Sequence, residues 1–82
     1  MRHELTWDRC CPGSYFSSSF IIARGAGTKV RVWFHIDRTR SGEWALELQP
    51  VNEPYPIEKY GNFRTGNDAR RKATEVICNR GL

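Results

Sequence analysis

The sequence predicts an α+β fold, in which a three-stranded antiparallel β-meander is followed by one C-terminal α-helix packed on one face. Residues 29–37 and 43–49 alternate apolar and polar side chains with the period of a half-buried strand. Helical spacing of apolar residues is confined to the last 20 residues or so. Because 82 residues supply one hydrophobic core and not two, we expect a single domain spanning residues 1–82.

The first quarter of the chain contains one short and one longer candidate strand. Leu5 and Trp7 alternate with polar neighbours in Glu4–Trp7, which is typical of an edge strand and would add a fourth strand to the meander. Cys10–Gly13 should end it, because proline lacks an amide donor and glycine permits a turn. Residues 15–24 are rich in aromatic and β-branched side chains, so we expect one uninterrupted strand. The side chains expected on one of its faces are Phe16, Ser18, Phe20 and Ile22.

The segment Lys29–Leu48 is expected to form the central hairpin, with the polar loop Arg38–Gly42 as its tip. The simplest antiparallel register pairs Ile36 with Trp44, Phe34 with Leu46 and Val32 with Leu48. A slip of one residue would turn all of these side chains to solvent, so we expect this register to be strongly specified.

The end of the chain is predicted as a loop followed by the helix. Residues 50–62 hold three of the four prolines and are expected to form a surface loop, with an extended piece at Ile57–Tyr60. Thr65 is the predicted N-cap, Asp68 completes a capping-box pattern, and Gly81 is the predicted stop. The side chains that fall on the packing stripe of this helix are Ala69, Ala73, Val76 and Ile77.

Composition limits the function classes. Thirteen basic against nine acidic residues give a net charge of +4, which permits contact with nucleic acid or an acidic protein without requiring either. No apolar run approaches the roughly 20 residues of a membrane span, and no secretory signal opens the chain. Three cysteines, an odd number, fit a reducing compartment, so we expect a cytoplasmic protein without membrane contact.

The sequence predicts neither catalysis nor a cofactor. Its cysteines and histidines lack C-x-x-C or H-x-x-x-H spacing, which argues against a metal site. It has no glycine-rich phosphate loop and no carboxylate pair at useful spacing, and 82 residues can hardly enclose a substrate. We therefore expect a non-catalytic binding module.

Two basic regions are candidate contacts. Arg70, Arg71 and Lys72 should fan around the solvent side of the helix, where they could bind phosphate or an acidic partner. The alternative is a solvated helix face in which Arg71 pairs with Glu75. Arg38 and Arg40 at the hairpin tip, with Lys29 and Arg24 at the far end of the sheet, form the second region, for which a solvated turn is the alternative.

The third candidate is Trp33, which Arg31 and His35 flank on the sheet face away from the helix. A tryptophan there could stack a base or anchor a protein partner. The alternative is that Leu5 or Trp7 of the N-terminal segment covers it. A bare Trp33 would make this face the binding surface.

The phrases "LTW", "SFIIAR", "GEWALEL" and "GNFRTGNDARRKA" resemble small uncharacterised proteins of β-β-β-α type that phages and other mobile elements encode. The resemblance covers nearly the whole chain. It implies an accessory protein that binds and modulates or inhibits a host protein or ribonucleoprotein complex, as anti-CRISPR and similar anti-defence proteins do.

The same order of elements is similar to phage-integrase arm-binding domains and plant GCC-box-binding domains, which read DNA with the sheet. Their exposed faces carry several basic residues, whereas Arg31 lies here beside Glu43 and Glu47. DNA or RNA binding is therefore the alternative function. A homodimer formed through an edge strand also stays open.

Overall fold

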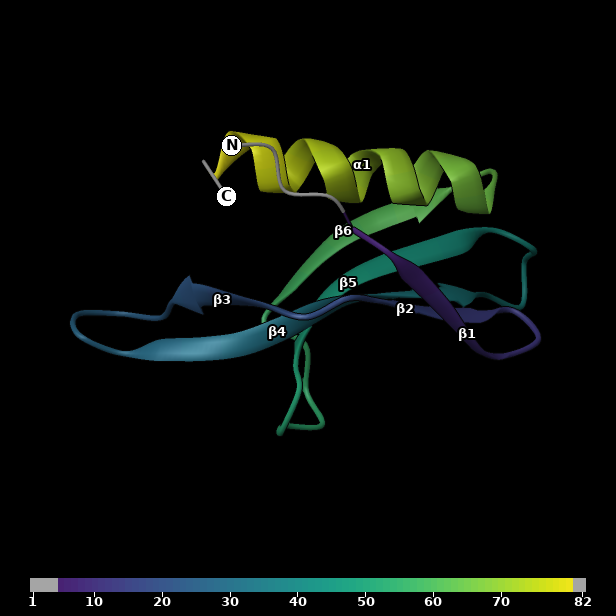
Figure 1. The fold of residues 1–82 in the computed structure, drawn as a ribbon. Helices are drawn as coiled ribbons and strands as arrows, with labels where there is room; N and C mark the ends of the chain where they lie inside the picture. The colour runs from purple at the N-terminus through teal and green to yellow at the C-terminus, as the bar shows by residue number, and fades with distance from the viewer. Residues whose placement is uncertain (1–4, 81–82) are drawn as a thin grey trace.

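The computed structural model describes residues 5–80, which form a six-stranded antiparallel sheet with one helix laid across one face (Figure 1). The elements in chain order are β1 (Trp7–Cys11), β2 (Ser14–Ser17), β3 (Phe20–Ala23), β4 (Lys29–Arg38), β5 (Trp44–Pro50), β6 (Glu58–Phe63) and α1 (Gly66–Asn79). The predicted α+β class is confirmed, but the sheet has more strands than the three or four expected.

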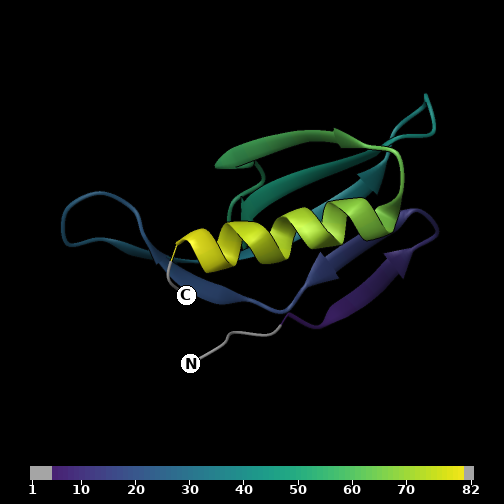
Figure 2. The same cartoon turned by 90° about the horizontal axis from the view of Figure 1, so that it is seen from above.

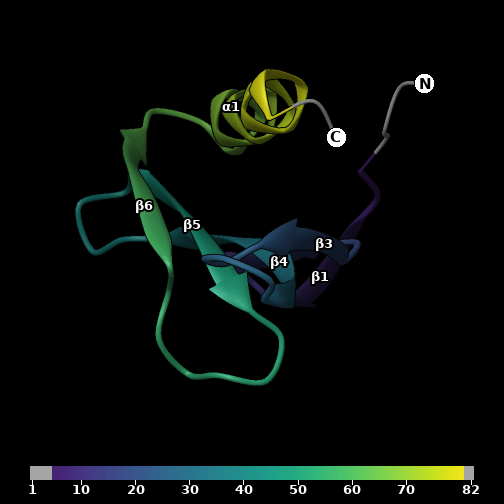
Figure 3. The ribbon, with the colours of Figure 1, turned by 90° about the vertical axis from the view of Figure 1, so that its left-hand side faces the viewer.

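The sheet runs in the order β1-β2-β4-β5-β6, and β3 also pairs with β4. All pairings are antiparallel, so the longest strand, β4, is the centre of a meander. Seen end on, the helix lies over one face of the sheet, while the loop between β5 and β6 projects from the other side (Figure 3). The sheet therefore has one covered face and one face without a layer of described secondary structure.

The single strand predicted over residues 15–24 is wrong, because an irregularity divides it into β2 and β3. Phe16 lies opposite His35, whereas Phe20 lies opposite Val32, so four steps on one strand match three on β4. An extra residue of this kind is a β-bulge, and it reverses the alternation of side chains. Phe16 therefore does not share a face with Phe20 and Ile22, which belong to the core.

The serine tract explains the bulge. The buried Ser17 hydroxyl accepts a hydrogen bond from the Phe34 amide at 2.8 Å and donates one to the Ser18 carbonyl at 2.9 Å. The Ser18 amide in turn donates to the Thr6 carbonyl at 2.8 Å. A side-chain oxygen thus replaces the backbone acceptor that β4 would find in a regular strand, which keeps the buried amide satisfied.

The predicted register of the central hairpin is wrong by two residues, although the predicted face is right. The observed core pairs are Ile36 with Leu46, Phe34 with Leu48 and Val32 with Pro50. The loop lies one residue later than expected, at residues 39–43, where the Thr39 amide donates to the Glu43 carbonyl at 2.8 Å and Gly42 takes the left-handed conformation at φ 89°. A two-residue shift preserves the faces because side chains alternate with period two.

The proline-rich segment forms less loop than predicted. Residues 58–63 form β6, which pairs with β5, so the loop is confined to residues 51–57. Lys59 lies opposite Glu47 and Asn62 opposite Ala45, which leaves one extra residue in β6. Gly61, at φ 89°, accommodates this bulge.

The N-terminal strand lies later than predicted. β1 begins at Trp7 and includes both Cys10 and Cys11, so the turn consists of Pro12 and Gly13. Glu4, the first residue of the predicted strand, lies outside the described residues. Because β1 pairs with β2 as far as Cys11, the strand includes both cysteines and ends before Pro12.

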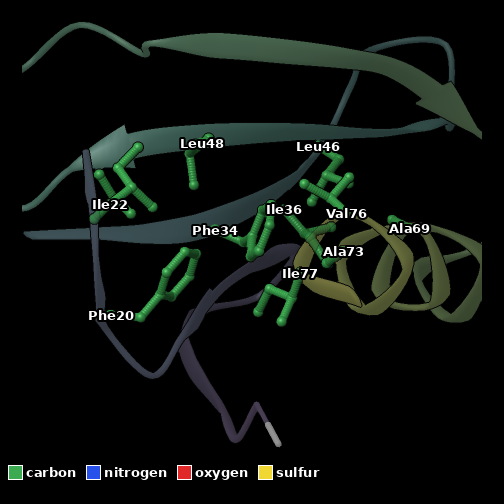
Figure 4. Packing of buried hydrophobic residues seen from close by; sticks show 11 residues of the cluster. Phe20, Ile22, Phe34, Ile36, Leu46, Leu48, Ala69, Ala73, Val76 and Ile77 are labelled. Atoms are coloured by element: carbon green, nitrogen blue, oxygen red, sulfur yellow. The ribbon is translucent and has the colours of Figure 1, made fainter. Parts of the chain in front are cut away.

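The helix matches its prediction closely. Thr65 caps it, accepting a hydrogen bond from the Asp68 amide at 3.1 Å on its hydroxyl. Its small alanines bring α1 close to the sheet, and its larger apolar residues reach the core (Figure 4). The buried residues of α1 are Ala69, Ala73, Val76 and Ile77, as the periodicity predicts. The predicted stop, Gly81, lies outside the described residues.

Candidate functional site

The sheet face opposite α1, here called the reverse face, carries the predicted Arg31, Trp33 and His35. The register places Phe16 beside His35, and Ile21 beside Arg31, on this same face. No helix or strand of residues 5–80 packs over it, and the 51–57 loop projects on this side (Figures 1 and 3).

Three aromatic rings meet at the middle of the reverse face. The Phe16 and His35 rings stack with centroids 4.5 Å apart and an interplanar angle of 13°. Phe16 also contacts Trp33, with centroids 5.0 Å apart and planes tilted by 56°. All three side chains are half-buried, so they form a partly exposed aromatic patch on this face.

Polar side chains fix the imidazole of His35 on both sides. Its Nε2 lies 3.0 Å from the Ser14 hydroxyl, and its Nδ1 lies 3.6 Å from a Glu47 carboxylate oxygen. The order Ser–His–Glu is that of a nucleophile, a base and an orienting acid. However, Ser14 is only 8% exposed, and 3.6 Å is too long for a hydrogen bond. The hydrogen bond to Ser14 therefore helps to hold the His35 ring stacked on Phe16.

Leu5 and Trp7 are not what shields Trp33. Leu5 and Trp7 pack against the core on the helix side of the sheet, and the ring that contacts Trp33 is Phe16. The indole Nε1 is buried without a hydrogen-bond partner among the described residues. The bulge that turns Phe16 to this face is why the sequence did not reveal the contact.

Sequence reasoning also missed the 51–57 loop as part of this surface. The Arg24 guanidinium pairs with the Glu53 carboxylate at 2.9 Å, and the Val51 amide donates to the Arg31 carbonyl at 3.0 Å. Tyr55 is 77% exposed on this anchored loop. The sequence feature that could have indicated this surface is Tyr55 between two prolines, because prolines restrict the backbone that carries the aromatic ring.

The three basic residues predicted as one patch on the helix make different contacts. The Arg70 guanidinium lies over the Tyr15 ring, 4.9 Å from its centroid, and is not on the solvent side. Lys72 pairs with Glu75 at 3.1 Å, so the predicted pairing of Glu75 with Arg71 is wrong. Arg71 instead lies 4.0 Å from Asp68 and is largely exposed.

The hairpin residue Arg38 belongs with Arg70. Its guanidinium lies over Trp44, 5.9 Å from the ring centroid, and Trp44 lies 5.9 Å from Tyr15. Two aromatic rings thus join the two basic regions that the sequence suggested separately. Arg40 is exposed at the tip of the same hairpin.

A polar cluster at the other end of α1 fastens the helix to β6. The Tyr60 hydroxyl and the Arg80 guanidinium both donate to the Glu58 carboxylate. The hydrogen bond from Tyr60, followed by that from Arg80, lowers the pKa of Glu58. Burial, reinforced by the hydrogen bond to Glu58, raises the pKa of Tyr60 to about 12. This cluster links the C-terminal end of α1 to β6.

Residues 5–80 contain no group of three or more potential ligands arranged to hold a metal ion. Cys10, Cys11 and Cys78 are free and exposed. Within the same range, no helix has the length and apolar character needed to cross a membrane.

Comparison with known proteins yields no match to a family model, to a curated protein or to a solved structure.

Proposed function

We propose that this protein is a non-catalytic binding module that docks on a host protein complex through its reverse face. The observation that carries the proposal is the Phe16–Trp33–His35 cluster, which no described layer of the fold covers. Aromatic side chains in a partly desolvated patch are the kind that dominate protein interfaces. A fold of this size shields one side of its sheet with α1 and leaves the other available.

The charges around the cluster favour a protein partner over a phosphate backbone. The register places Asp8 beside Phe16, and Lys59 beside Glu47, so acidic and basic side chains alternate across this face. Lys29 and Arg31 are further basic residues on it, and Asp37 is a further acidic one. A mixed rim of this type selects a complementary protein surface, whereas phosphates require an excess of basic groups.

Two exposed apolar side chains extend the surface beyond the aromatic cluster. Ile21 is 47% exposed on β3, and Tyr55 is 77% exposed on the 51–57 loop. Because ion pairing and backbone hydrogen bonds anchor that loop, the tyrosine is presented with little loss of freedom on binding. We propose Tyr55 as a peripheral anchor of the interface.

We further propose that docking modulates or inhibits a host complex in the cytoplasm, as phage-encoded anti-defence proteins do. It rests on the resemblance of the β-β-β-α sequence phrases. A small protein that binds through one face can inhibit a complex by covering one of its functional surfaces, which requires no catalytic group.

The test is affinity capture from nuclease-treated host lysate with matched variants. Arg31→Ala and Tyr55→Ala alter the reverse side, and Arg71→Ala removes the same charge from the outer surface of α1. The proposal expects the wild type and Arg71→Ala to capture the same proteins and the two reverse-side variants to lose at least tenfold of the signal. Equal capture by all four proteins, or capture abolished by nuclease, would rule it out.

A further inference from the structure

A second surface lies at the end of the sheet where α1 begins. Arg70 of α1, Tyr15 of β2, Trp44 of β5 and Arg38 of β4 form a continuous row, here called the arginine–aromatic cluster. The successive separations are 4.9 Å from guanidinium to Tyr15, 5.9 Å between the rings, and 5.9 Å from Trp44 to the second guanidinium. Each arginine is therefore held by a ring face.

A third arginine adjoins the row. Arg9 pairs with Tyr15 across β1 and β2, and paired residues of antiparallel strands share a face, so Arg9 lies on the helix side. The turn after β1, the β4–β5 hairpin and the start of α1 all lie at this end of the molecule (Figure 2). The positive end of the helix dipole adds to the potential of the three guanidinium groups there.

The acidic side chains nearest to the cluster are directed elsewhere. Asp37 lies opposite Ser14 and Ala45 and so points to the reverse face, while the Glu43 carboxylate accepts a hydrogen bond from Ser41. Asp68 lies near Arg71. No carboxylate of residues 5–80 pairs with any of the cluster's arginines.

The arginines consequently keep unused hydrogen-bond donors. Arg70 donates from Nη1 to the Asn67 side-chain oxygen at 3.0 Å, and its Nε is buried, so the donors left for a ligand are its remaining Nη N–H groups. A ring holds a guanidinium by its face and leaves the N–H groups on its edge free. Such an edge matches the oxygens of a phosphate.

We infer that the arginine–aromatic cluster, with Arg9, binds the phosphodiester backbone of a nucleic acid. The guanidinium groups come from β1, β4 and α1 and are spread along a row, which suits a chain of repeated phosphates better than a single anion. This site is separate from the reverse face and does not depend on the function proposed for that face. Lys72 and Arg71 do not belong to it, because each lies beside a carboxylate.

The test is the salt dependence of binding to a fluorescent single-stranded DNA of about 20 nucleotides, measured by anisotropy on the full chain. Three phosphate contacts predict a slope of about −2 in a plot of log affinity against log salt. Arg9→Gln and Arg38→Gln should each reduce its magnitude by about 0.7. Lys29→Gln, which removes one exposed charge at the opposite end of β4 from Arg38, should leave the slope unchanged.

The outcomes separate the cluster from general attraction. Reduced slopes in both cluster variants with an unchanged control support the assignment. Equal reductions in all three variants, or no binding at about 50 mM salt, would overturn it. It would also fail if a polyglutamate peptide displaced the DNA at a lower concentration than unlabelled DNA does, because the cluster would then be a site for an acidic protein.

Discussion

Replacing Ser17 with alanine tests the bulge that shapes both faces of the sheet. The Ser17 hydroxyl is the acceptor for the buried Phe34 amide at 2.8 Å, and the residue is only 4% exposed. The variant would leave a buried donor without a partner, at a cost of about 1–3 kcal/mol. That is a large part of the roughly 5–15 kcal/mol by which small domains are stable.

Urea unfolding measures the effect directly. With a slope of roughly 1–2 kcal/mol/M, a loss of about 2 kcal/mol lowers the midpoint by about 1–2 M. Ser19→Ala is the matched control, because its hydroxyl accepts only an exposed hydrogen bond from Arg31 at 3.0 Å and should cost less than about 0.5 kcal/mol. Equal midpoints for the two variants would refute the role given to Ser17.

Three further predictions concern α1 and its attachment to β6. Thr65→Ala should destabilise the fold by about 1 kcal/mol in urea unfolding, because the Asp68 amide loses its cap, whereas Thr65→Ser should not. Since the folded pKa of Glu58 lies below 4.5, its contribution to stability is complete above pH 4.5 and is lost as the pH falls through the folded value. Melting temperatures of the wild type and Glu58→Gln should therefore converge on acidification, and a constant gap would argue against the ion pair. In a spectrophotometric titration one tyrosine, Tyr60, should ionise near pH 12, and Glu58→Gln should lower that value; a titration in which every tyrosine ionised near pH 10 would contradict its burial.

The helix could be predicted because its signals are local. A capping threonine, an acidic residue three positions later and four apolar residues at helical spacing need no knowledge of the rest of the chain. The alternation that places Arg31, Trp33 and His35 on one face is equally local, because β4 is regular along its length.

The bulge and the registers could not be predicted, because they depend on partners distant in sequence. Ser17 acts on Phe34, seventeen residues away, and nothing in the tract of three serines indicates which hydroxyl will replace a ladder acceptor. The two-residue error in the hairpin arose because alternation fixes the face of each side chain but not the position of the turn, which lies one residue later than expected and includes Gly42 at positive φ.

The reverse face and the arginine–aromatic cluster could likewise be predicted only in part from the sequence. The reverse face was predicted from β4, but Phe16 was assigned to the wrong side because the bulge was not foreseen. Arg38 and Arg70 were candidates in separate regions. The rings that join them, Tyr15 and Trp44, come together only through the tertiary fold.

The most direct test of the account is site-specific photo-crosslinking to the captured partner. In separate variants, a photoreactive amino acid replaces Arg31 or Tyr55 on the reverse side. In the control variants it replaces Arg71 or Glu75 on the outer surface of α1. The account predicts a crosslinked product of increased mass from positions 31 and 55 and none from positions 71 and 75. Products from the helix positions alone would contradict the assignment of the reverse face as the docking surface.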